Sequence, residues 1–391
     1  MLPGLFAALA LAPLYWLVVP ARWRRDVLSG ASLCALGLYD ARLVPLLVAV
    51  TLALGGALHV IVASDGRRRG ALGAATVALL VALFVWNKQA GQALGVLPSQ
   101  SGVVFLGISF LVLKATGVVL DCARGTLRDT PLRDLLAWLV FLPTYPSGPM
   151  ETFAHFRGQA STWDRRRALG GLERILLGLV KALVFAHYLG AWIDPIVAAP
   201  EAASPALLLL ALYALALRFY FDLAGYSDLA IGLAALYGYD IAENFDRPFA
   251  ARNLAQLWQR WHMTLTGWLR TYVFTPLTRA LMRRSGAAGD RLAVAAGLLA
   301  TLLLIGLWHG LRWNFVVYGL LQAAAVIWVS VFARDAGRRL LAPGLVRWWR
   351  TSRIGYALSV WLTVTFFSLT GIFILADVMP ALRYLRAMCG L

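Results

Sequence analysis

The segment LAVAAGLLATLLLIGLWHG (292–310) contains an uncharged, mostly apolar run from Leu292 to Trp308 and then a histidine and a glycine. A run of this length approaches the roughly 20 residues that an α-helix needs to cross a ~30 Å hydrocarbon core. His309 therefore lies at the end of a predicted membrane span, where burying an imidazole without partners costs free energy. Because ionisable groups at membrane depth are candidates for function, His309 is the first residue to explain.

Apolar runs of similar length recur along the whole chain. Of its 391 residues, 60% are hydrophobic and 14% are charged, and the mean hydropathy is +0.72. This composition indicates an all-α polytopic membrane protein with no soluble domain between its spans. We predict roughly ten transmembrane helices plus re-entrant segments. The first run, Leu5 to Val19, has no basic leader and no cleavage site, so we expect it to be retained.

The net charge of +17 is better explained by the membrane than by nucleic acid. Cytoplasmic loops of membrane proteins carry an excess of Lys and Arg, and the basic residues here are spread over particular loops. The clusters lie at 22–25, 67–69, 124–133, 157–174 and 334–353. We therefore predict that these loops are cytoplasmic.

One apolar segment breaks the alternation of sides. Leu135–Tyr145 is too short to cross a bilayer and lies between two basic loops, which favours a re-entrant segment. Its end is rich in helix-breaking residues: Pro143, Pro146, Gly148 and Pro149. Irregular backbone at membrane depth is tolerated where it is buried in protein or lines a cavity. The segment thus predicts a cavity that opens towards the cytoplasm.

A second histidine lies on a predicted helix from Leu254 to Tyr272, whose apolar residues recur at steps of three and four. The helical period places Gln259, His262 and Thr266 along one polar edge of this helix. Two interpretations fit: a helix packed between protein and a hydrated cavity, or an amphipathic helix on the membrane surface with a solvated histidine.

His309 also has two interpretations. It is either an interfacial histidine bonded to a carbonyl group, or a general base that takes a proton from an attacking hydroxyl group. By the charge pattern, His262 starts from the cytoplasmic side and His309 from the outer side, so together they could line a route across the bilayer. Further polar residues lie between these regions, among them Asp228 and Asn244. The three cysteines are isolated, and no metal-ligand spacing is present.

Four motifs carry a family resemblance. FDLAGYSDLAIG (221–232), ENFDRPF (243–249), WQRWHMTLT (258–266) and GLWHG (306–310) resemble the membrane-bound O-acyltransferase family. Within it, the chain is similar to the bacterial branch that contains alginate O-acetyltransferases and D-alanyl transfer proteins. GISF (107–110) with the preceding Leu106, and PTYPSGP (143–149), also resemble that branch.

The resemblance implies a single membrane-embedded acyltransferase domain over residues 1–391, with its core at about 100–333 and a central tunnel from the cytoplasm to the outside. It places the two functional histidines at His309 and His262. His309 would be the base, and His262 would orient the thioester carbonyl or line the tunnel. Further substrate or tunnel residues would be Trp261, Thr266, Gln259, Asn244, Asp228 and Trp308.

The same resemblance implies a multi-pass protein of the bacterial cytoplasmic (inner) membrane. An acyl group, with acetyl as first choice, would pass from a cytoplasmic thioester donor, either acetyl-CoA or the phosphopantetheine of an acyl carrier protein. No cofactor would be bound permanently. The acceptor would be a cell-envelope polysaccharide or a periplasmic or extracellular partner transferase.

The sequence also departs from the family pattern. Arg270 is followed by Thr271 where family members have an acidic residue, and the part after Arg334 is short, so we expect one or two helices of larger homologues to be absent. D-alanyl transfer from a carrier protein to a teichoic-acid-like polymer is the alternative activity. A transporter or flippase without acyl chemistry is the competing class.

Overall fold

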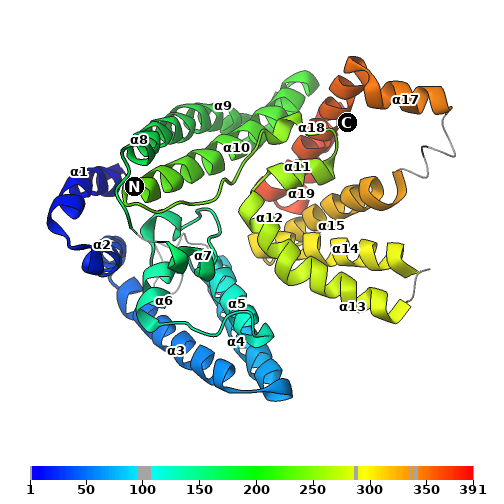
Figure 1. Cartoon of the computed structure of the whole chain (residues 1–391). Helices are drawn as coiled ribbons and strands as arrows, with labels where there is room; N and C mark the ends of the chain where they lie inside the picture. The colour runs from blue at the N-terminus through cyan, green and yellow to red at the C-terminus, as the bar shows by residue number, and fades with distance from the viewer. Residues whose placement is uncertain are drawn as a thin grey trace. The chain divides into compact units, whose positions relative to one another are not determined.

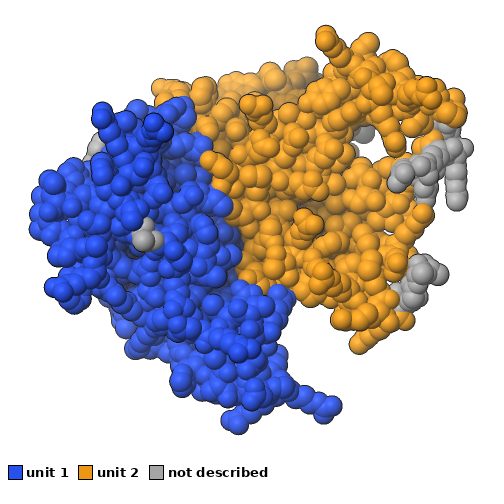
Figure 2. All heavy atoms as spheres, viewed as in Figure 1, with its two compact units in different colours: residues 1–179, 226–242 blue, residues 180–225, 243–391 orange. Residues whose placement is uncertain are grey.

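The computed structural model describes residues 2–94, 107–159, 161–285, 289–333, 337 and 342–390. These residues form helices joined by turns and loops, and none of them lies in a β-strand (Figure 1). The chain divides into two compact units, coloured separately in Figure 2. Unit 1 comprises Met1–Leu179 and Tyr226–Ala242, and unit 2 comprises Val180–Gly225 and Glu243–Leu391.

Unit 1 contains most of the N-terminal helices. Its elements are α1 (Leu2–Val18), η1 (Ala21–Trp23), α2 (Arg24–Tyr39), α3 (Leu43–Ala63), α4 (Gly66–Leu94), α5 (Ile108–Arg124), α6 (Leu132–Leu139), η3 (Leu142–Thr144), α7 (Phe153–Gly158) and α8 (Arg165–Leu179). The C-terminal part of α10 (Pro205–Leu236) also belongs to it. Their buried apolar side chains form one continuous core.

The segment predicted to be re-entrant lies in this core. Helix α6 has eight residues, far fewer than a membrane crossing requires, and Trp138 and Phe141 are almost completely buried. The chain then turns through η3. Tyr226 of α10 holds this turn, since its hydroxyl group donates a hydrogen bond to the carbonyl of Pro143 at 3.2 Å. The irregular backbone is thus buried in protein, one of the two settings that permit it at membrane depth. The cavity expected beside it stays a prediction.

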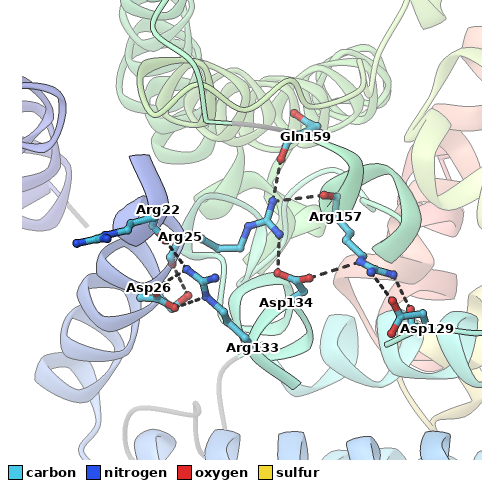
Figure 3. Close-up of polar contacts among 9 residues, drawn as sticks. Arg22, Arg25, Asp26, Asp129, Arg133, Asp134, Arg157 and Gln159 are labelled. Atoms are coloured by element: carbon cyan, nitrogen blue, oxygen red, sulfur yellow. Dashed lines mark hydrogen bonds and ion pairs between the residues drawn. The ribbon is translucent and has the colours of Figure 1, made fainter. Parts of the chain in front are cut away.

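A polar network fastens α6 and α7 to α2, as Figure 3 shows. Arg25 donates to Asp134 at 2.5 Å and to the carbonyl of Gln159 at 2.8 Å. Asp134 also lies 3.5 Å from Nε of Arg157, which in turn contacts Asp129 at 2.5 Å. The carboxylate of Asp134 therefore joins two arginines that come from different helices.

Unit 2 contains both histidines singled out by the sequence. Its elements are the π-helical η4 (Val180–Ala186), α9 (His187–Ala198), η5 (Pro200–Ala202), the first part of α10, η6 (Pro248–Ala250), α11 (Leu254–Arg260), α12 (Met263–Leu269), the π-helical η7 (Arg270–Phe274), α13 (Thr275–Ser285), α14 (Asp290–His309), α15 (Trp313–Ile327), the π-helical η9 (Trp328–Phe332), α17 (Pro343–Thr351), α18 (Arg353–Leu375) and α19 (Val378–Met388).

Helices α14 and α15 form a tight antiparallel pair (Figure 1). A Cβ atom added at Gly306 would lie 2.3 Å from the carbonyl oxygen of Phe315, and one at Gly319 would lie 3.0 Å from that of Leu302. Small residues of this kind let two membrane helices approach closely. The close approach fixes the end of α14, where His309 lies.

A chain of buried hydrogen bonds connects α11 to α15 and α18. Nε1 of Trp258 donates to Gln322 at 3.1 Å, and the amide of Gln322 donates to the hydroxyl oxygen of Thr370 at 2.7 Å. Gln322 is only 1% exposed. Because an unpaired polar group at such a position is costly, this chain fixes α11 against the two spans.

Within the residues that the structure describes, seven helical stretches are long and apolar enough to cross a membrane, so the chain is a multi-pass membrane protein. They are Leu43–Ala63, Gly66–Gln89, Arg165–Ala198, Pro205–Leu236, Asp290–His309, Trp313–Phe332 and Arg353–Leu375. The predicted count of about ten is not confirmed, because α1, α2 and α5 have only 17, 16 and 17 described residues. Leu106 and Arg334 lie outside the described residues.

Candidate active site

The helix predicted from Leu254 to Tyr272 is not continuous. Helix α11 ends at Arg260, Trp261 is extended, and His262 has a left-handed backbone with φ 46° before α12 begins at Met263. Non-glycine residues rarely adopt this conformation, and where they do it is held by the surrounding structure, often at a functional site. The polar edge predicted for Gln259, His262 and Thr266 was therefore wrong, because the break changes the helical period between them.

Backbone pairing with the loop after α10 holds this break in place. The backbone N–H of Asp246 donates to the carbonyl of Arg260 at 3.0 Å, and that of Met263 donates to the carbonyl of Asn244 at 2.9 Å. These bonds satisfy groups that an uninterrupted helix would have paired within itself. The motif ENFDRPF thus forms the support for the histidine motif that follows it.

The side chain of Asn244 completes this support. Its Oδ1 lies 3.3 Å from the backbone nitrogen of Thr264, 2.8 Å from the Thr264 hydroxyl group and 3.0 Å from Nδ1 of His262. Both Asn244 and His262 are buried, at 2% and 6% exposure. Thr264 was not among the predicted site residues, although it stands two positions after His262 in the same motif.

These contacts determine which nitrogen of His262 carries the proton. A backbone N–H can only donate, so the Asn244 atom that it contacts is the carbonyl oxygen, which can only accept. Nδ1 of His262 must then donate to the same oxygen, and Nε2 carries the lone pair in the neutral ring. Burial, with a smaller contribution from the nearby His309, lowers the pKa of His262 to about 3, so the ring is neutral near pH 7.

His309 ends α14 within an aromatic cluster. Its ring centroid lies 4.9 Å from that of Trp308, 6.2 Å from Phe315 and 6.3 Å from Tyr318. The helix ends at Gly310, whose backbone is extended, and a Cβ atom there would lie 2.3 Å from the Phe315 ring, so glycine permits the close approach of this ring. His309 is close enough for its charge to affect the pKa of His262, so unit 2 brings the two histidines together.

Aromatic rings surround the start of α12. Trp261 is buried at 6% exposure, and its ring lies 5.0 Å from Phe367 and 5.3 Å from Phe245. The hydroxyl group of Thr266 donates to the carbonyl of Trp261 at 3.3 Å. Phe245 also approaches His262, with 6.4 Å between ring centroids. Aromatic rings thus border His262 on the side of Phe245 and Trp261, next to its contact with Asn244.

Two of the predicted site residues differ from the rest. Gln259 is exposed near the end of α11. Asp228 belongs to unit 1, where its carboxylate lies 3.0 Å from Nε of Arg174. Asp228 thus has a structural partner within its own unit. The described residues contain no group of three or more His, Cys, Asp or Glu side chains that could hold a metal ion.

A sequence profile of the membrane-bound O-acyltransferase family matches residues 43–376. This chain belongs to that family. The match includes both histidines, Asn244 and the segment predicted to be re-entrant.

Curated relatives fall into two groups. The chain is 31% identical over 238 residues to the teichoic acid D-alanyltransferase of Streptococcus thermophilus, covering 59% of this chain and 57% of that protein. For the Bacillus subtilis protein of the same name the identity is 29% over 246 residues, covering 61% of this chain and 62% of that protein. The "Probable alginate O-acetylase AlgI" of Azotobacter vinelandii is 31% identical over 251 residues, with 62% and 47% covered. The chain thus matches about half to three fifths of the length of these relatives.

Proposed function

We propose that the chain is a membrane-embedded O-acyltransferase that moves an acyl group from a thioester to a hydroxyl group. The observation that carries the proposal is the arrangement in unit 2, where His262, neutral because it is buried, contacts Asn244 through Nδ1 and lies near His309. Membership of the family supports the same reaction class.

In the proposed reaction His309 is the general base. It takes the proton of the acceptor hydroxyl as that oxygen attacks the thioester carbonyl carbon. The carbon–sulfur bond then breaks, and the proton passes from His309 to the departing sulfur, which leaves as a thiol. The products are an ester and a thiol, and no proton is gained or lost overall.

His262 has a different part in this proposal. With its proton on Nδ1, the ring presents Nε2 as a hydrogen-bond acceptor. An acceptor suits a hydroxyl or amide N–H of a substrate better than a thioester carbonyl oxygen, which needs a donor. We therefore assign His262 to positioning the acceptor hydroxyl or the amide-bearing arm of the donor, with Trp261, Trp308 and Thr266 bordering the tunnel.

The proposal extends to donor, acceptor and location. The donor is acetyl-CoA or an acyl carrier protein on the cytoplasmic side, with no permanently bound cofactor. The acceptor is a cell-envelope polysaccharide or a secreted partner transferase, and the location is the bacterial cytoplasmic membrane. Because the family match runs from 43 to 376, we propose that both units form one acyltransferase domain.

D-alanyl transfer is the second candidate. The relatives of both groups have nearly the same identity to this chain, 31% and 29% for two teichoic acid D-alanyltransferases and 31% for the alginate relative. Supplying purified protein with acetyl-CoA or with a D-alanyl carrier protein in parallel would distinguish them.

The test uses the full chain in proteoliposomes, with release of free thiol from each donor as the readout. We expect His309→Gln and His262→Asn each to lower thiol release by about 100-fold or more, within the range for lost acid–base catalysis. His187→Gln, which changes an exposed histidine of the same unit, is the matched control and should retain activity. Unchanged thiol release in both site variants, with loss of polymer movement, would instead support a transporter or flippase.

A further inference from the structure

Helix α17 (Pro343–Thr351) is short and almost entirely exposed. Its sequence is PGLVRWWRT, and three large apolar side chains remain accessible: Leu345 at 47%, Trp348 at 41% and Trp349 at 37%. In a membrane protein, large apolar side chains that the protein itself leaves exposed contact lipid or another apolar partner. The face that they form is therefore expected to have a partner.

The helical period separates the residues of α17 into two faces. At about 100° per residue, Leu345, Val346, Trp348 and Trp349 occupy one side, and Arg347 and Arg350 lie together on the other. Tryptophan and arginine on opposite faces of one short helix are typical of helices that lie in the membrane interface. In that position the rings reach the acyl-chain boundary and the guanidinium groups reach the headgroups.

The connection to α18 places α17 at the end of a membrane span. Helix α17 ends at Thr351, and α18 begins at Arg353 after Ser352, whose hydroxyl oxygen accepts the N–H of Gly355 at 2.9 Å. A Cβ atom at Gly355 would lie 2.3 Å from the carbonyl oxygen of Trp349, so glycine permits the tight corner. The position of α17 is thus tied to the point where α18 enters the membrane.

Arg252 fixes the end of α17 from another part of unit 2. Its guanidinium donates to the carbonyl of Arg350 at 3.0 Å and to that of Trp349 at 2.9 Å, and it lies over the Tyr356 ring at 5.5 Å. The last carbonyls of a helix favour such a cation. Because the C-terminal end is held by two bonds, the rotation of α17 about its axis is restricted and its two faces have defined directions.

We infer that α17 is an interfacial helix that binds anionic phospholipid headgroups on the predicted cytoplasmic side of the membrane. Its charge fits this occupant, since Arg347, Arg350 and Arg353 are basic and the sequence from 336 to 376 contains no Asp or Glu. Each basic residue near an anionic surface contributes about 1 kcal/mol, equivalent to roughly fivefold in affinity. The inference concerns lipid binding and does not depend on the proposed acyl transfer.

Lipid binding can be measured on the purified full chain in zwitterionic detergent by counting bound phosphatidylglycerol with native mass spectrometry. We expect Arg347→Gln with Arg350→Gln to weaken this binding by about 25-fold. The matched control is Arg383→Gln with Arg386→Gln on α19, which removes the same charge from two exposed positions of another helix of unit 2. Equal binding by both double variants, or displacement of the lipid by millimolar inorganic phosphate, would overturn the lipid assignment.

A second measurement tests which face meets the membrane. Nitroxide labels are placed at Leu345→Cys and Arg347→Cys in a background in which Cys34, Cys122 and Cys389 are changed to Ala, and the protein is reconstituted in nanodiscs that contain phosphatidylglycerol. The label at 345 should be accessible to oxygen and shielded from a water-soluble nickel chelate, whereas the label at 347 should show the reverse. Similar accessibility at both positions would contradict an interfacial helix.

Discussion

Oδ1 of Asn244 lies 3.0 Å from Nδ1 of His262 and 2.8 Å from the hydroxyl group of Thr264. One buried amide therefore holds the left-handed break before α12 and also determines the tautomer of the imidazole. The backbone break and the ring of His262 therefore both depend on Asn244, which stands 18 positions before His262 in the chain.

Asn244→Ala should affect activity more than stability. The substitution removes the acceptor for Nδ1–H, so His262 can move its proton to Nε2, and we expect kcat for thiol release to fall by roughly 100-fold with a smaller change in KM. Nitrogen NMR of labelled histidine should report the change of tautomer directly. Asn253→Ala is the control, because it removes the N-cap of α11 and costs about 1 kcal/mol of stability without touching His262. An unchanged tautomer in Asn244→Ala would contradict our assignment.

His262 makes the protein sensitive to acid. Its pKa is about 3 in the folded chain, against about 6.5 for an unperturbed imidazole, so between these values the unfolded state binds more protons. Stability should therefore fall as the pH drops below about 6.5, by roughly 2 kcal/mol at pH 5. Thermal unfolding at several pH values should show a shallower dependence for His262→Asn, since asparagine tolerates the left-handed backbone and has no proton to bind. Identical pH dependence in the two proteins would rule out this contribution.

Gly306→Ala should separate α14 from α15. The new methyl group would lie 2.3 Å from the Phe315 carbonyl oxygen, and backbone cannot move aside as a flexible side chain can. We expect a loss of about 2 kcal/mol or more, measured by thermal unfolding in detergent, together with reduced activity because His309 lies three residues further on. Gly371→Ala in α18 is the matched control. A Cβ atom there meets nothing within 4 Å, so this variant should be as stable as the original or slightly more stable.

Asp134→Asn should destabilise unit 1. The side chains of Asp134 and Arg25 are only 16% and 19% exposed, and removing the charge leaves Arg25 and Arg157 without their shared carboxylate. We expect a loss of roughly 2 kcal/mol, less than for a fully buried pair because water still reaches these groups. Asp129→Asn breaks a neighbouring contact of Arg157 in which the carboxylate is 69% exposed, and it should cost less than about 1 kcal/mol. Equal losses of unfolding free energy in the two variants, measured by chemical denaturation, would show that burial of the carboxylate does not decide the effect.

Much of the fold could be predicted because membrane spans are local features of a sequence. The apolar run before His309 predicted a membrane span, and the structure has the helix Asp290–His309 there. Helix-breaking prolines between basic loops predicted irregular backbone around Pro143, and the structure shows this backbone buried in protein. The number of membrane spans was harder to predict. A helix needs a minimum length to cross the bilayer, and the described parts of α1, α2 and α5 are slightly shorter than that.

Only part of the candidate site could be predicted from the sequence. An ionisable group next to an apolar run can be recognised without coordinates, so His309, His262 and the family motifs followed from the sequence by itself. The break at Trp261 and His262 could not be predicted, because local periodicity favoured one continuous helix. Only the hydrogen bonds of Asn244 and Asp246 make two separate helices more stable. Likewise, the family motif made Asp228 a candidate site residue, but its pairing with Arg174 depends on how two distant helices pack. Tertiary structure decided these features because a buried polar group takes the partner that packing brings to it, wherever that partner stands in the chain.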